Sequence, residues 1–73
     1  MLVKFKYIEA SDDYDYIKAV DYDDPTEIIK LVKQVDSIII NDEWYEFAWS
    51  EFKPAESKEC LDILNIFVDR KYA

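Results

Sequence analysis

Two segments near the N-terminus alternate hydrophobic and polar side chains with the period of two that is typical of strands. They cover residues 2–10 and 14–22. The intervening Asp12–Asp13 suits a tight turn, because aspartate tolerates left-handed backbone angles and accepts hydrogen bonds from its own backbone. A two-residue turn at this point predicts a hairpin in which Phe5 faces Val20.

The next segment has the pattern of a helix. Asp24, Pro25 and Glu27 are residue types favoured at the N-cap and at the first and third helical positions. Hydrophobic residues then recur at i, i+3, i+4 and i+7, a spacing that places them on one helical face. This stripe consists of Ile28, Leu31, Val32 and Val35.

Alternation returns between residues 38 and 49, on both sides of Asn41–Asp42. The chain contains no glycine, so Asn and Asp must fill the turn positions that need a positive φ. We therefore predict a second hairpin. One face of it would carry Ile38, Ile40, Tyr45, Phe47 and Trp49, and the other Ile39, Trp44 and Ala48. Whether Trp44 belongs to the core or to an exposed recognition surface stays open.

The C-terminal segment, residues 54–70, supports two interpretations. Helical spacing runs from Cys60 to Val68, after a Pro54 that suits a helix start. The alternation of residues 64, 66 and 68 fits a strand instead. We favour the helix, which would bury Cys60 on its apolar stripe. The predicted fold is then α+β in the order ββαββα, a four-stranded sheet built from two β-hairpins with two helices, and a fifth strand is the alternative.

Length and composition predict one folded domain over residues 1–73. A chain of 73 residues buries only roughly 60% of its unfolded surface. Because 51% of the residues are hydrophobic and 16% are aromatic, the composition favours a folded chain over a disordered one. The N-terminus has no continuous apolar region typical of a signal peptide, and no apolar run approaches the roughly 18 residues of a membrane span. We expect a cytoplasmic protein that does not bind membranes.

The residue types argue against catalysis and against bound cofactors. Histidine is absent, which removes the commonest general base and metal ligand, and the lack of glycine excludes phosphate-binding loops. Calcium-loop registers that begin at Asp13 or Asp21 place Ile17 or Pro25 where an oxygen ligand is required. We therefore expect no enzyme activity, no catalytic residue, no metal site and no cofactor.

The net charge of −8 lies on the two predicted hairpins. Residues 9–24 carry seven acids and one lysine, and residues 36–51 carry five acids and no basic residue. If the helix crosses over between parallel second and third strands, the exit of the second strand approaches the second turn. This geometry predicts one acidic cluster of Asp21, Asp23, Asp42 and Glu43 beside Tyr22 and Trp44.

These features predict a small acidic protein-binding module. Its charge repels nucleic acid but is attracted to basic protein surfaces, such as those of a nuclease, a polymerase or another nucleic-acid-binding protein. We expect an inhibitor that mimics phosphate charge (a DNA mimic), with the build of a virus-encoded antagonist of host defence. The alternatives are an antitoxin or immunity partner of a basic toxin, and a structural homodimer without an inhibitory role. The candidate contact residues are Asp21, Tyr22, Asp23, Asp42, Glu43 and Trp44, with Tyr14, Asp15 and Glu46 as secondary contacts.

Overall fold

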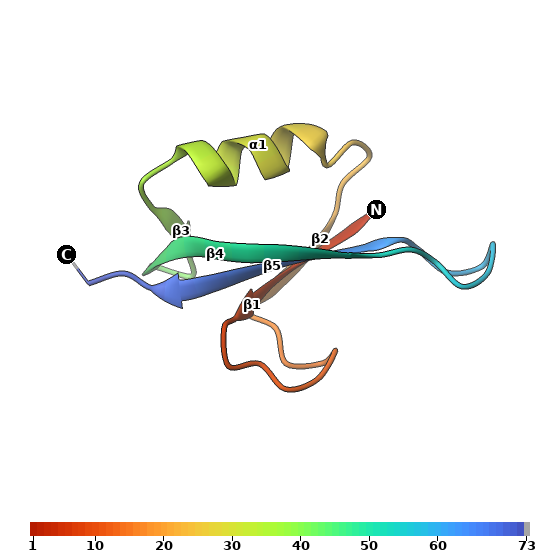
Figure 1. Cartoon of the computed structure of the whole chain (residues 1–73), viewed down its shortest axis with the longest axis horizontal. Coiled ribbons are helices and arrows are strands. Elements are labelled where there is room, and N and C mark those ends of the chain that lie inside the picture. Colours follow the sequence, from red (N-terminus) through yellow and green to blue (C-terminus); the bar gives the residue numbers. More distant parts are fainter. Residues whose placement is uncertain (73) are drawn as a thin grey trace.

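The computed structural model describes residues 1–72 and shows one helix packed on a mixed, five-stranded sheet (Figure 1). The strand order is β2-β1-β5-β4-β3, and the sheet curves until it is nearly barrel-shaped. Neighbouring strands are antiparallel except for β1 and β5, which are parallel. The elements are β1 (Leu2–Tyr7), β2 (Lys18–Asp21), α1 (Thr26–Gln34), β3 (Ile38–Ile40), β4 (Glu43–Lys53) and β5 (Ile63–Arg70).

The predicted second helix is wrong, and the alternative of a fifth strand is confirmed. The segment forms β5, which lies between β1 and β4 at the centre of the sheet. Five consecutive residues, Leu64–Val68, are buried because both faces of this central strand are covered. Burial on both faces weakens the alternation that identifies a strand, and this explains why helical spacing was the stronger signal.

The hydrophobic core lies between α1 and one face of the sheet. From the helix, Val32 is buried, and Ile28 and Ile29 pack against the buried cluster. Full burial of side chains such as Ile66 stabilises the fold by ~1.5–3 kcal/mol each. The sheet contributes Val3, Phe5, Ile40, Tyr45, Leu64, Ile66 and Val68 to this cluster.

The helix predicted after residue 24 is confirmed, but it begins at Thr26 with Pro25 at the N-cap position, one residue later than predicted. The carboxylate of Asp24 accepts a hydrogen bond from the backbone N–H of Thr26 at 3.0 Å. This bond holds the pKa of Asp24 below its ordinary value. Two residues of the predicted stripe, Leu31 and Val35, are exposed, because α1 turns Ile28, Ile29 and Val32 toward the sheet.

The first hairpin exists, but its predicted register is wrong. Phe5 faces Lys18 instead of Val20. A ten-residue connection, residues 8–17, replaces the expected two-residue turn. It folds back over the sheet on the side away from α1 (Figure 1). The connection contacts the sheet through Lys4 and Lys53.

The second hairpin is confirmed, turn included. Asn41 and Asp42 have φ angles of 51° and 65°, the left-handed conformation that two-residue hairpin turns require. The predicted assignment of side chains to the two faces is correct as far as Phe47. A bulge between Phe47 and Trp49 then reverses the alternation. Trp49 therefore lies on the face of Trp44, opposite to its predicted side.

The expected crossover between adjacent parallel strands is also wrong. The helix connects β2 to β3, and these strands occupy opposite edges of the sheet. Within residues 1–72, no helix has both the length and the apolar character needed to cross a membrane.

Candidate functional site

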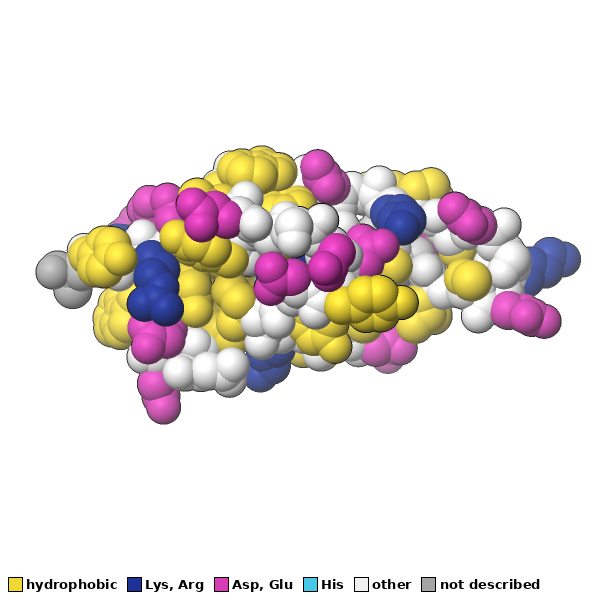
Figure 2. Space-filling model, turned by 90° about the horizontal axis from the view of Figure 1, so that it is seen from below, with side chains coloured by type: hydrophobic (Ala, Val, Ile, Leu, Met, Phe, Trp, Pro, Cys, Tyr) yellow, Lys and Arg dark blue, Asp and Glu magenta, His cyan; other side chains and the backbone are white. Residues whose placement is uncertain are grey.

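The sheet face that does not contact α1 is only partly covered. The β1–β2 connection folds over its β1 side and reaches Lys53 at the end of β4, whereas Ile39, Trp44 and Trp49 stay exposed. Figure 2 shows the molecule from this side, with hydrophobic side chains in contact with one another and acidic side chains among and around them. The strand registers place six side chains together here, five exposed and Asp69 half-buried, and we name this group the open face. It consists of Ile39, Trp44, Glu46, Trp49, Glu51 and Asp69.

The aromatic and aliphatic side chains of the open face are about half exposed. Trp44 lies directly opposite Ile39 on neighbouring strands, and these side chains are 49% and 58% exposed. Trp49 is 45% exposed and stacks on Phe67, with 5.0 Å between the ring centroids. The sequence left the position of Trp44 open, and the structure places it at the surface.

Two carboxylates of the open face lie opposite each other. Glu46 faces Asp69 across the β4–β5 pair, an arrangement that disfavours strand pairing through like-charge repulsion. Asp69 accepts a hydrogen bond from the backbone N–H of Arg70 at 2.8 Å. In the part of the chain that the structure describes, neither carboxylate forms an ion pair. Burial raises the pKa of the nearby Tyr7 phenol, and the carboxylates of Asp69 and Glu9 raise it further.

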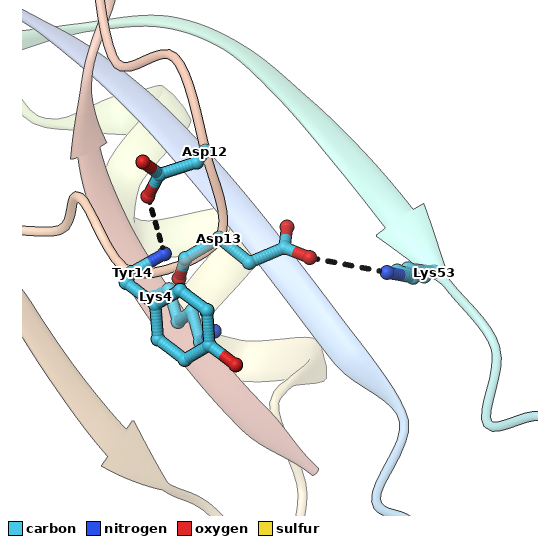
Figure 3. A network of polar contacts seen from close by, with 5 residues as sticks. All are labelled: Lys4, Asp12, Asp13, Tyr14 and Lys53. Carbon is cyan, nitrogen blue, oxygen red and sulfur yellow. Dashed lines mark hydrogen bonds and ion pairs between the residues drawn. The ribbon is translucent and has the colours of Figure 1, made fainter.

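The β1–β2 connection is attached to the sheet by lysines (Figure 3). Lys4 Nζ donates to the backbone carbonyl of Asp13 at 2.9 Å and lies 5.4 Å from the ring centroid of Tyr16. The Asp13 carboxylate pairs with Lys53 Nζ at 3.4 Å. Within the connection, the carboxylate of Asp12 accepts from the backbone N–H of Tyr14 at 2.8 Å. An acidic loop therefore covers basic residues of its own sheet.

Asn65 is a buried polar residue on this covered side. It lies between Lys4 and Glu51 in the register and is only 6% exposed. Its Oδ1 atom has no hydrogen-bond partner among residues 1–72. Lys6, also buried, places its Nζ 5.6 Å from the ring centroid of Phe67. Polar groups thus occupy the interior beneath the loop, whereas the α1 side is apolar.

The structure does not bring the predicted acidic cluster together. Asp21 pairs with Leu2 at the β2 exit, beside the start of β5, whereas Glu43 contacts Arg70 at the end of β5, with 3.8 Å between charged atoms. The eight residues of β5 separate these two positions by roughly 24 Å. The predicted contacts fall into three groups. They are Asp42, Glu43, Trp44 and Glu46 on the β3–β4 hairpin; Asp21, Tyr22 and Asp23 at the β2 exit; and Tyr14 and Asp15 in the β1–β2 connection.

The environments of these groups differ. Asp21 forms an ion pair with the N-terminal ammonium at 3.2 Å, and Tyr22 packs against the core. Tyr14 and Asp15 are exposed, and Tyr14 is the most exposed of the large hydrophobic side chains that the structure describes. The hairpin group is exposed throughout and overlaps with the open face. The hairpin and the β1–β2 connection thus both expose acidic and aromatic side chains, and the hairpin group is the one that adjoins the open face.

Four residues of the open face were missed as candidate contacts: Ile39, Trp49, Glu51 and Asp69. Nothing in the local pattern reveals the bulge that turns Trp49 to this face. Asp69 could be placed opposite Glu46 only by knowing that β5 pairs with β4. The alternation of residues 38–40 did predict that Ile39 shares a face with Trp44.

A cavity of about 180 Å³ lies at the other end of the molecule, in the β4–β5 connection. Cys60 lines it and is exposed, so the expected burial of Cys60 on a helix is wrong. Its Sγ accepts a hydrogen bond from Ser57 Oγ at 3.4 Å. Residues 1–72 contain no group of three or more metal-ligating side chains arranged to hold an ion.

Comparison with known proteins identifies no relative: no family model, no curated protein and no solved structure matches this chain. Its function must therefore be argued from the geometry of the described residues.

Proposed function

We propose that this chain is a small acidic protein-binding module. It docks its acidic, aromatic-bearing hairpin surface on a basic surface of a nucleic-acid-handling protein, such as a nuclease or polymerase. It acts as an inhibitor by placing carboxylates at the positions where the partner binds phosphates. The module has no catalytic role of its own and works in the cytoplasm.

The observation that carries this proposal is that most acidic side chains of the protein form no ion pair within the described part of the chain. The chain has 17 acidic residues, and the ion pairs found in the described part engage only Asp13, Asp21 and Glu43. All three pairs are exposed, where an ion pair contributes little to folding. The remaining acids create a negative field that attracts a basic partner and accelerates its association.

Exposed aromatic residues support the same proposal. Tryptophan and tyrosine are enriched among the residues that dominate binding energy at protein interfaces. Trp44 and Trp49 are both half-exposed and lie on the same face as Glu46. Apolar anchors beside carboxylates provide contact area as well as charge attraction.

The test is capture of partners by the tagged protein from a cell lysate, repeated with excess duplex DNA as competitor. A DNA mimic should capture a nucleic-acid-binding protein and lose it when duplex DNA is added. Capture of a single basic toxin that duplex DNA does not displace would support the antitoxin function instead. Capture of no basic protein at all would overturn the proposal.

The homodimer alternative has its own test. Each copy carries a charge of −8, so pairing of two acidic faces is opposed by repulsion. Size-exclusion chromatography with light scattering should therefore report a monomer. A stable dimer in which the tryptophans are protected from solvent would favour a structural role.

A further inference from the structure

We propose that the open face is the docking surface of this module and that its occupant is an arginine-bearing segment of a partner protein. The arginine side chains lie against Glu46 and Asp69, and the apolar parts of the segment pack on Trp44, Trp49 and Ile39. This inference rests on the proposed function. It also replaces the predicted contact at the β2 exit with a specific surface.

The open face has no partner within the described chain. The opposite sheet face is covered by α1, and the β1–β2 connection covers the β1 side, where Lys4 and Lys6 are buried. On β3 and β4, Ile39, Trp44 and Trp49 keep about half of their surface in contact with water. Contiguous exposed apolar side chains with a polar surround are typical of interaction sites.

The carboxylates of the open face form no ion pair in the described part of the chain. The neighbouring basic groups lie elsewhere: Lys53 pairs with Asp13, Arg70 pairs with Glu43, and the buried Lys6 has its Nζ against the ring of Phe67. The Glu46–Asp69 pair keeps its like-charge repulsion, which a cation placed between the two carboxylates would relieve. Glu51 adds a third carboxylate on the same face of β4. The face therefore favours a cationic occupant.

The type of cation follows from the chemistry of the open face. A guanidinium group is planar, donates two parallel hydrogen bonds to carboxylates and stacks on aromatic rings. Trp44 and Trp49 lie on either side of Glu46 along β4, so aromatic and carboxylate contacts are available to one extended segment. A lysine ammonium forms the charge contact but cannot stack in this way. Arginine thus fits this face better than lysine.

A second copy of the chain does not fit the face. It would bring another set of carboxylates against Glu46 and Asp69, and the repulsion would add to that already present. The charge of the occupant must be opposite to that of the chain.

The experiment uses the fact that both tryptophans of the chain lie on the open face. Their fluorescence, and its quenching by acrylamide, reports on this surface alone. The probe is a nona-arginine peptide, with nona-lysine for comparison, titrated into the intact protein. Occupation of the open face should protect the tryptophans from acrylamide, and nona-arginine should do so at lower concentration than nona-lysine.

Matched variants locate the contact. Glu46→Gln with Asp69→Asn and Asp21→Asn with Asp23→Asn each remove two negative charges, so the two proteins have the same net charge. The first pair should weaken nona-arginine binding by about fivefold, and the second by less than twofold, from the range of exposed charge pairs. Ile39→Thr keeps the β-branched shape, and it should weaken binding without any change in charge.

Equal losses from the two double variants would overturn the inference, because attraction would then be diffuse. Binding without protection of the tryptophans would overturn it as well. Neither result contradicts the proposed function. That function is contradicted by a different result, the capture of no basic protein from the lysate. Conversely, a captured partner that binds the Glu46→Gln, Asp69→Asn protein normally leaves the function intact and rejects this surface.

Discussion

Trp49 stacks on Phe67 with 5.0 Å between ring centroids and 20° between ring planes, although strict alternation along β4 would place Trp49 on the opposite face. The bulge after Phe47 inserts one residue and turns the rest of β4 over. Both tryptophans then share the open face. One backbone irregularity thus decides whether the face is aromatic on both sides of Glu46.

The stack leads to a prediction about stability. Phe67 is 8% exposed, so Phe67→Ala should reduce the free energy of unfolding by about 3 kcal/mol through lost burial and a residual cavity. Trp49→Ala should cost only about 1 kcal/mol, because half of the ring is already in water and mainly the stacking is lost. Urea denaturation measures both. A larger loss for Trp49→Ala than for Phe67→Ala would contradict the assignment of Phe67 to the buried side of the stack.

The unpaired Oδ1 of Asn65 leads to a second prediction. A buried polar atom without a partner costs about 1–3 kcal/mol, and an apolar side chain of similar shape removes this cost. Asn65→Leu should therefore leave stability unchanged or raise it by about 1 kcal/mol. Asn65→Ala serves as the control and should destabilise the fold, because it leaves a cavity at a buried position. Destabilisation by Asn65→Leu would show that Asn65 makes a polar contact important for folding.

The attachment of the acidic loop leads to a third prediction. Lys53→Gln removes only an exposed ion pair and should change the free energy of unfolding by less than about 1 kcal/mol. Lys4→Met removes two other contacts, the hydrogen bond to the Asp13 carbonyl and the cation–π contact with Tyr16. It should therefore loosen the β1–β2 connection. Amide hydrogen exchange of residues 10–17 measures this directly. Faster exchange in Lys53→Gln than in Lys4→Met would contradict the assignment of Lys4 as the main attachment of the connection.

The start of α1 leads to a prediction about pH. Asp24 has a lowered pKa because its carboxylate accepts from the Thr26 N–H, so the charged form stabilises the folded state. This contribution is present above the ordinary carboxyl pKa of 3.8 and is lost as the pH falls through the folded-state pKa. Asp24→Asn keeps an acceptor but does not titrate. Between pH 5 and pH 2, the unmodified protein should lose more stability than Asp24→Asn, and equal losses would contradict the role of this bond.

The parts of the fold that the sequence predicted correctly are those governed by local chemistry. Asn41–Asp42 formed the expected turn because, without glycine, few other residue types tolerate two successive positive φ angles. The helix after Asp24 and the first strand were also predicted, each from a clear period along the chain.

The errors concern contacts between distant segments. The segment around Ile66 reads ambiguously because a central strand is apolar on both faces, and only its neighbours show that it is a strand. The predicted turn at Asp12–Asp13 is wrong because β1 ends at Tyr7 and β2 begins at Lys18, a pairing that depends on the sheet and not on local residue types. The acidic cluster failed for the same reason, since its geometry required a strand order that the pattern does not contain.

The most direct test of the account is the association rate of the captured partner, measured from low to high salt. Exposed charges are screened within ~8 Å at physiological ionic strength, so attraction through the acidic surface should make association fall steeply as salt rises. Glu46→Gln with Asp69→Asn should flatten this dependence more than Asp21→Asn with Asp23→Asn. An association rate that is independent of salt would contradict the account, because the acids would then contribute nothing to recognition.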